Sequence, residues 1–240
     1  MKFVPLASSS RGNAYIVQDD GIPPLLLEAG LPIKQLRNKL REHGIMLSDL
    51  AGCLVSHEHM DHAKAVKDLL KAGVDCWMSQ GTAEALTVID HHRTHILRYK
   101  FDIILLNGGW YPFMTFGLKH DAKDPVGFFI QDLKDDRLLF IPDTAYVENR
   151  FEGVTMIAIE CNNIAELLSK NILEGNIPAV VGRRIRRHHM SLENLIAMLK
   201  ANDLSRCRQI FLMHLSDGNS DEKAMINRIQ EATGIPTRAC

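Results

Sequence analysis

The chain has 240 residues, of which 46% are hydrophobic and 24% are charged, a composition typical of a globular protein and not of a disordered one. Twenty-eight Lys and Arg residues face 29 Asp and Glu residues, so the net charge of −1 excludes an overall field that draws the chain to nucleic acid or to an anionic membrane. Any polyanion must therefore be met by a local patch. The length suits a single domain, which we predict over residues 1–240.

Cysteine usage and hydropathy indicate the compartment. The five cysteines are odd in number and form no CxxC pair, which argues against both a disulfide framework and a thiolate zinc site. The first apolar stretch is too short for a secretory leader, and no apolar run nears membrane-spanning length. We therefore predict a cytoplasmic protein without a membrane association. The oligomeric state stays open, with a dimer as one option.

In the first half of the chain, short apolar runs alternate with helical periodicity. Strands are predicted over residues 3–6, 14–18, 24–27, 53–55 and 75–79, and helices over 32–43, 65–72 and 82–91. The strand at 53–55 runs directly into a cluster of histidines, and a helix follows. This cluster is therefore predicted to lie at a strand-to-helix turn.

The second half of the chain opens with a strand-rich stretch. Strands are predicted over 103–106, 110–120, 126–133 and 137–141, with turns at 107–109 and 134–136. A strand at 155–160, helices at 164–173 and 192–199, a strand at 209–215 and a helix at 222–233 complete the chain. Two successive rounds of strands followed by helices favour an α/β fold, an αββα sandwich of four layers.

Four side chains of metal-ligand type are gathered within residues 57–62. His57 and His59 project the same way from an extended segment, and Asp61 and His62 follow as the chain turns into a helix. Imidazole and carboxylate ligands suit zinc or another borderline divalent metal, and four such groups can serve two adjacent ions. The alternative is a polar, histidine-rich helix cap.

The same run begins like the zinc-protease pattern HExxH. That pattern fails because Asp61 occupies its fifth position. Glu58 is therefore predicted to point away from the metals and not to act as a general base.

Three further ligand-type residues follow in a fixed order, namely His120, Asp143 and His214. With the HxHxDH run, this order resembles the metallo-β-lactamase superfamily over nearly the whole chain. Within that family the likeness is strongest to the YycJ/WalJ branch of bacterial nuclease-like proteins, through residues 6–13, 119–125, 142–146 and 213–216. Without the resemblance, His120 is equally explained as a surface imidazole, His214 as a core histidine and Asp143 as a helix N-cap.

The resemblance implies two divalent metal ions, zinc or manganese, with iron as a further option. One ion would be held by His57, His59 and His120, the other by Asp61, His62 and His214, and Asp143 would bridge them. Glu28 stands where the family usually has an aspartate that supports the metal ligands, and its extra methylene could loosen that support.

The resemblance also implies a mechanism for phosphodiester hydrolysis. A hydroxide shared by the two metals attacks phosphorus, and Asp61 is counted among the catalytic residues. His189 matches the general acid that protonates the leaving oxygen, and Glu160 matches the carboxylate that orients it. The alternative is that His189 only precedes a helix cap at Ser191 and that Glu160 is a solvated acid at a strand end.

Four arginines lie directly before the proposed acid, namely Arg183, Arg184, Arg186 and Arg187. Arg is the side chain best shaped for bidentate phosphate contacts. We therefore predict that these residues bind substrate, together with Asn13 from the turn rich in Ser and Gly. The alternative is a solvated cationic loop.

The leading functional hypothesis is a two-metal phosphodiesterase, an exonuclease-like DNA nuclease with DNA as its partner. A second hypothesis keeps the metals but changes the substrate to a small phosphodiester, lactone or thioester, for which the arginines are unnecessary. A third is a non-catalytic module that binds DNA or a protein partner. The native metal, the direction of digestion and a bacterial or phage origin are left open.

Overall fold

The chain forms two compact units in a computed structural model that describes residues 1–98, 101–106 and 109–240. Unit 1 comprises residues 1–117 and 122–136, and unit 2 comprises residues 118–121 and 137–240. The predicted turn at residues 107–109 lies largely outside the described residues. That the whole chain is one domain stays a prediction.

Unit 1 contains a mixed sheet that carries the histidine cluster at one end. Its strands follow in sequence order: β1 (Lys2–Ala7), β2 (Ala14–Asp19), β3 (Ile22–Leu27), β4 (Gly52–Leu54), β5 (Cys76–Ser79) and β6 (Thr94–Leu97). The first three strands form an antiparallel meander, and the strands from β3 to β6 run parallel. A separate antiparallel ladder joins β7 (Phe101–Leu106), β8 (Gly109–Gly117) and β9 (Val126–Gln131).

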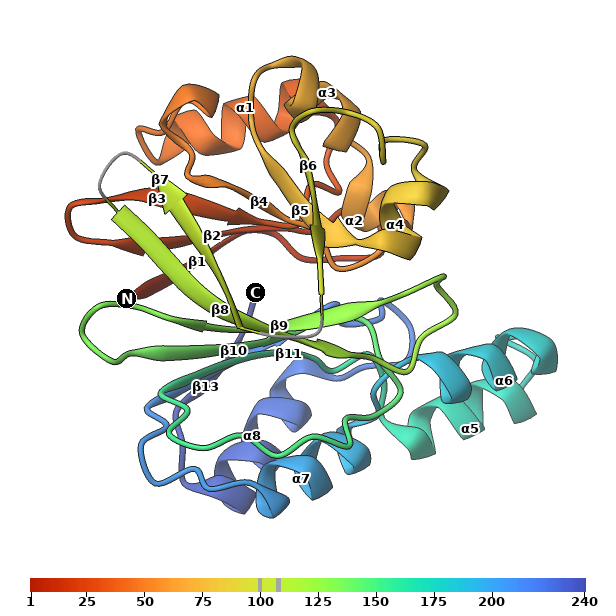
Figure 1. Cartoon of the computed structure of the whole chain (residues 1–240). Helices are drawn as coiled ribbons and strands as arrows, with labels where there is room; N and C mark the ends of the chain where they lie inside the picture. The colour runs from red at the N-terminus through yellow and green to blue at the C-terminus, as the bar shows by residue number, and fades with distance from the viewer. Residues whose placement is uncertain (99–100, 107–108) are drawn as a thin grey trace. The chain divides into compact units, whose positions relative to one another are not determined.

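Helices cover one side of the β1–β6 sheet (Figure 1). They are α1 (Ile33–Glu42), α2 (Met60–Ala63), α3 (Val66–Lys71) and α4 (Gln80–Ala85), with a 3-10 turn at Leu47–Asp49. The predicted periodicity of α1 is confirmed, since Leu36 and Leu40 are fully buried in the same hydrophobic cluster as Leu26 and Leu69. Each such leucine contributes about 1.5–3 kcal/mol of burial free energy. The packed layer fixes where β4 ends and the histidine cluster begins.

Unit 2 is built on parallel strands. These are β10 (Arg137–Ile141), β11 (Met156–Glu160), β12 (Gln209–Met213) and β13 (Thr237–Ala239). The helices are α5 (Ala165–Leu173), α6 (Ala179–His188), α7 (Leu192–Ala201) and α8 (Glu222–Thr233). Helices α7 and α8 lie together, and α5 and α6 lie side by side (Figure 1). Carboxyl ends of parallel strands meet at one edge of a sheet, where sites in α/β proteins are commonly built.

Most predicted elements are confirmed, but several bounds differ, and strands β6 and β13 were not predicted. The helix predicted over 82–91 is wrong beyond Ala85, because Thr87 adopts a left-handed conformation with φ of 54° and the chain turns toward β6. The strand predicted over 110–120 ends at Gly117. The segment that contains the four arginines is helix α6 and not a loop. The α/β fold class is confirmed. Across the described residues, no helix has the length and apolar character needed to span a membrane.

Candidate metal centre

The four early ligand candidates lie together in unit 1, between the end of β4 and helix α2. The ring centroids of His57 and His62 are 4.2 Å apart, and those of His57 and His59 are 4.7 Å apart. Asp61 Oδ2 lies 3.5 Å from His62 Nε2. A short extended segment followed by one helical turn therefore places three imidazoles and a carboxylate side by side, as predicted from the spacing.

Two of these imidazoles are held through their Nδ1 atoms. His57 Nδ1 lies 2.8 Å from the Ser56 hydroxyl, and His62 Nδ1 lies 3.4 Å from Glu28 Oε2. When one ring nitrogen of a metal-binding histidine has a hydrogen-bonding partner, the orientation of the ring is fixed and the other nitrogen binds the metal. On His57 this leaves Nε2 as the expected metal-binding atom, whereas on His62 the amide nitrogen of Asn13 lies 3.2 Å from Nε2.

Glu28 contacts His62 from a fully buried position at the end of β3. Its backbone has φ of 64°, a conformation that costs about 1–3 kcal/mol for a residue other than glycine. Burial raises the pKa of this carboxyl group, and the hydrogen bond and charge of His62 oppose that rise. The longer glutamate thus still reaches His62, a predicted metal ligand, as the predicted supporting role requires.

Asn13 is also fully buried and is tied to the same ligands. Its Nδ2 atom donates to the carbonyl of Asp61 at 3.2 Å and lies 3.2 Å from His62 Nε2, while its Oδ1 atom accepts from the Tyr15 hydroxyl at 3.0 Å. Asn13 therefore anchors the start of α2, a role that the sequence analysis missed. Its predicted contact with substrate stays a prediction.

Glu58 contacts a neighbouring segment of unit 1. Its Oε1 atom accepts a hydrogen bond from the backbone N–H of Lys123 at 2.7 Å. The carboxylate is thus engaged by the 122–136 segment of unit 1, in agreement with the prediction that it is not a general base.

Gly30 makes the close approach between these segments possible. A Cβ atom at this position would lie 1.7 Å from the Asp61 carbonyl oxygen and 2.7 Å from the Asn13 nitrogen, both of which are backbone atoms. We expect Gly30→Ala to lower the free energy of unfolding by roughly 3 kcal/mol, because backbone atoms cannot move aside cheaply. Urea unfolding measures this effect. Gly218→Ala is the matched control, since its Cβ would meet nothing within 4 Å; equal unfolding midpoints for the two variants would contradict the expectation.

A second group of ligand-type residues lies in unit 2, at the ends of its strands. Asp143, Glu160, His189 and His214 offer ligand atoms that all lie within 4.8 Å of one another. His214 Nδ1 is 3.3 Å from Asp143 Oδ1, and His120 Nε2 is 3.8 Å from Asp143 Oδ2. His214 follows β12 directly with φ of 55°, so a left-handed residue sets this ligand candidate at the strand end, as Glu28 does in unit 1.

The alternative explanations for His120 and Asp143, a surface imidazole and a helix N-cap, are wrong. The side chain of His120 is only 1% exposed, so it is not a surface imidazole. No helix follows Asp143 before α5 in this fully described stretch, so Asp143 is not a helix N-cap.

Glu160 organises the unit 2 group from a fully buried position. Its Oε1 atom accepts from His189 Nδ1 at 2.5 Å and lies 3.2 Å from His214 Nδ1. Its Oε2 atom accepts from the backbone N–H groups of Thr144 at 2.9 Å and Met190 at 3.0 Å. The alternative of a solvated strand-end acid is therefore wrong. Ser191 does cap α7, but His189 makes this separate contact as well.

Electrostatics favours an ion pair between His189 and Glu160. Burial lowers the pKa of His189, but the charge and hydrogen bond of Glu160 and the charge of Asp143 outweigh it, so the pKa is raised above its usual value. Burial raises the pKa of Glu160, and the charge of His189 and the hydrogen bonds of His189 and His214 reverse this, so its pKa is lowered. An imidazolium held against a carboxylate can release a proton from Nε2.

His120 is held by helix α6. Its Nδ1 atom donates to the carbonyl of His188 at 2.7 Å, and its Nε2 atom lies 3.2 Å from Asp121 Oδ1. Burial lowers the pKa of His120, which favours the neutral form that binds metals. Burial raises the pKa of Asp121, but the hydrogen bond from Arg184 and the nearby positive charges lower it to about 2. The sequence analysis did not find this chain of contacts.

The four arginines of α6 are all exposed but differ in their contacts. Arg184 Nε donates to Asp121 Oδ2 at 2.7 Å, and Arg186 donates to the Ser169 hydroxyl at 2.9 Å. Within the residues that the structure describes, the side chains of Arg183 and Arg187 form no hydrogen bond or ion pair. Two arginines therefore fasten α6 to the rest of unit 2, and two remain available to a ligand.

The donor set of each unit fits a divalent metal. Unit 1 offers three imidazoles and a carboxylate, and unit 2 offers buried imidazoles around Asp143, with several rings fixed through one nitrogen. Histidine and carboxylate donors without thiolates suit zinc, manganese and iron.

Comparison with known proteins agrees with this chemistry. A family model described as a beta-lactamase superfamily domain matches residues 25–215. The chain belongs to this superfamily. An exodeoxyribonuclease WalJ of Streptococcus pneumoniae is 29% identical over an alignment of 249 positions, which covers 96% of this chain and 89% of the relative. An exodeoxyribonuclease YycJ of Bacillus anthracis is 29% identical over an alignment of 246 positions, which covers 98% of this chain and 91% of the relative.

Solved structures of the superfamily share the fold. The metallo-β-lactamase fold protein YhfI of Bacillus subtilis has a TM-score of 0.70 at 12% identity, covering 99% of this chain and 95% of that one. The short form of human tRNase Z has a TM-score of 0.64 at 14% identity, covering 100% of this chain and 96% of that one. The predicted fold family and its YycJ-like branch are confirmed.

Superfamily membership also confirms that the chain is a metal-dependent hydrolase, over the non-catalytic alternative. Divalent metal ions are its cofactors. The identity and number of the ions and the role of each residue stay predictions.

Proposed function

We propose that the chain is an exonuclease that hydrolyses phosphodiester bonds of DNA. The observation that carries this proposal is the buried Glu160–His189 pair at 2.5 Å beside a group of metal-ligand residues. A leaving alkoxide of DNA needs a proton, and this pair is built to supply one. The names of the two relatives, which cover nearly the whole chain, support DNA as the substrate.

The proposal assigns the ligand groups of both units to one centre with two divalent ions. His57, His59 and His120 would hold one ion, Asp61, His62 and His214 would hold the other, and Asp143 would be shared. This assignment is supported by the order of ligands along the chain and by the donor chemistry within each unit. Bound ions lower the pKa of a coordinated water and stabilise negative charge on phosphoryl oxygens.

His189 donates the proton to the leaving oxygen. Its Nδ1–H is committed to Glu160, so the proton that moves is the one on Nε2. Glu160 is a positioning residue, because it acts through His189 and also contacts His214. Asp61 would hold a metal ion and count among the catalytic residues, and Asn13 would contact the substrate.

Cleavage assays test the proposed function. Metal-loaded protein is given end-labelled single- and double-stranded DNA with Mn²⁺ or Zn²⁺, with and without a chelator. We expect release of mononucleotides that stops when the chelator is added. Internal cuts without mononucleotides would contradict an exonuclease, and hydrolysis of lactones or thioesters without any DNA cleavage would favour the small-molecule alternative.

The arginines of α6 make a separate prediction about DNA affinity. Arg183 and Arg187 lie one helical turn apart and bind the phosphate backbone, whereas Arg184 and Arg186 hold α6 in place. Replacing both Arg183 and Arg187 by Ala is expected to raise KM for DNA and to reduce the slope of log affinity against log salt by about 2. Arg37→Ala, which removes an exposed arginine of α1, is the matched control and keeps the wild-type slope. Equal slopes for all three proteins would contradict this division of roles.

A cytoplasmic location is part of the proposal. It is supported by the five cysteines, all of which are free thiols.

A further inference from the structure

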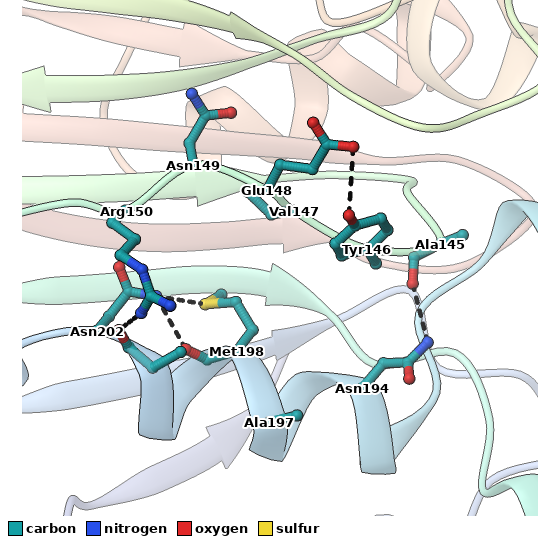
Figure 2. A pocket seen from close by; sticks show the side chains of 11 residues that line it. Ala145, Tyr146, Val147, Glu148, Asn149, Arg150, Asn194, Ala197, Met198 and Asn202 are labelled. Carbon is teal, nitrogen blue, oxygen red and sulfur yellow. Dashed lines mark hydrogen bonds between the residues drawn. The ribbon is translucent and has the colours of Figure 1, made fainter.

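A pocket of about 580 Å³ opens in unit 2 between the segment that follows β10 and helix α7 (Figure 2). Its lining residues are Ala145, Tyr146, Val147, Glu148, Asn149, Arg150, Asn194, Ala197, Met198, Ala201 and Asn202. The volume falls in the range of small-molecule sites. None of these residues is used by the metal centre or by the predicted arginine contacts.

The pocket wall is bonded to the segments that carry two ligand candidates. The backbone N–H of Lys119 donates to the Thr144 hydroxyl at 2.9 Å, and this hydroxyl donates to the carbonyl of Tyr146 at 2.9 Å. The N–H of Ala145 donates to the carbonyl of Lys119 at 2.9 Å. Lys119 precedes His120 and Thr144 follows Asp143, so the pocket begins within two residues of the ligand group of unit 2.

The pocket presents a flat aromatic ring to solvent. The side chain of Tyr146 is 47% exposed, and its hydroxyl donates to Glu148 Oε1 at 3.2 Å (Figure 2). Ala197 and Met198 of α7 add apolar surface opposite this segment. A ring of this kind can stack on any nucleobase, because every base has a π-face.

The polar groups of the pocket are amides more than free charges. Asn194 donates to the carbonyl of Ala145 at 3.2 Å, which fixes its amide, and Asn149 is exposed. Glu148 lies 3.6 Å from the Lys119 ammonium, and Arg150 donates to the carbonyl of Ala201. Arg150, the one cation among the described lining residues, is thus engaged, as are Glu148, Asn194 and Asn202, which favours a neutral ligand part over a phosphate. The exposed amide of Asn149 is suited to hydrogen bonds with a base edge.

We propose that this pocket binds one nucleobase of a single DNA strand next to the cleaved phosphodiester, with Tyr146 stacked on the base. The inference rests on the proposed function, which it deepens by naming a subsite for one base of the substrate. A base can enter only when it is unpaired and unstacked. The pocket can therefore take a base from a single strand or from the frayed end of a duplex, and it tolerates all four bases.

Tyr146→Ala and Tyr146→Phe test the stacking contact. Binding of a fluorescent, phosphorothioate-protected oligonucleotide to metal-loaded protein is measured, so that affinity is read without turnover. We expect Tyr146→Ala to weaken binding about tenfold. Tyr146→Phe keeps the ring and is expected to stay within about twofold of wild type.

A substrate with a missing base completes the cycle. An abasic residue is moved along the oligonucleotide one position at a time. At one position we expect the abasic oligonucleotide to bind wild type about tenfold more weakly than the intact one does. Tyr146→Ala should cause no further loss there, because deleting the ring and deleting the base remove the same contact. Additive losses at every position, or equal affinity of Tyr146→Ala and wild type for the intact strand, would overturn the proposed base pocket.

Hydrolysis of methyl p-nitrophenyl phosphate separates this inference from the proposed function. The reporter has no nucleobase, so Tyr146→Ala is expected to retain the wild-type kcat/KM. A wild-type protein that hydrolyses neither the reporter nor DNA would overturn the proposed function, whereas the binding cycle would still decide whether Tyr146 holds a base.

Discussion

His59→Ala is expected to lower kcat/KM for DNA by about a thousandfold or more. His59 lies against His57 at the start of α2 and is proposed to bind the first metal ion. Loss of a ligand removes several kcal/mol of stabilisation of the transition-state charge, and each 1.36 kcal/mol corresponds to a factor of ten in rate. Steady-state kinetics with excess Mn²⁺ or Zn²⁺ measures the effect.

His92→Ala is the matched control for this variant. His92 is an exposed histidine that stacks on His91 and belongs to neither ligand group. We expect wild-type kinetics from His92→Ala. Full activity of His59→Ala would show that the cluster at residues 57–62 is not the metal centre of the enzyme.

His189→Ala is expected to lower kcat for DNA by 10²- to 10⁴-fold, the usual range for the loss of a general acid. The same variant should hydrolyse methyl p-nitrophenyl phosphate at nearly the wild-type rate, because p-nitrophenolate leaves without a proton. A ratio of DNA to reporter activity that is unchanged from wild type would rule out His189 as the acid.

Glu160→Gln adds a pH signature to this test. Removing the negative charge of Glu160 lowers the pKa of His189, since that charge holds the pKa above its usual value. The reaction requires protonated His189, so the limb of the pH–rate profile that falls with rising pH should shift to lower pH. Because Glu160 also contacts His214, the metal content of the variant is measured in parallel. A limb that stays in place would contradict the proposed pairing.

The local features of the site could be predicted from the sequence, whereas its long-range contacts could not. Residues 57–62 form a strand end, a turn and a helix start, so their spacing alone gathers the ligands. Asn13 meets Asp61 and His62 from 48 and 49 residues away, and Arg184 meets Asp121 from 63 residues away. No periodicity encodes such pairs, because they depend on how distant segments pack.

Helix α6 escaped prediction for a similar reason. The segment has few apolar residues beside its four arginines, so the run of charges dominates its sequence pattern, and only Gly182 is buried in it. A Cβ atom on Gly182 would lie 2.2 Å from the side chain of Ile172, which shows that α6 packs closely on α5. Packing against α5 therefore stabilises this helix. The four arginines lie on its exposed surface.

The central claim is that histidines of both units bind divalent metal ions. The metal content of purified protein tests this claim most directly. Wild type, His59→Ala from unit 1 and His214→Ala from unit 2 are loaded with Mn²⁺ or Zn²⁺, desalted and analysed by mass spectrometry of the metal. We predict about two ions per chain for wild type and a clear loss in each variant. Less than one ion per chain in wild type, or a full complement in His214→Ala, would contradict it.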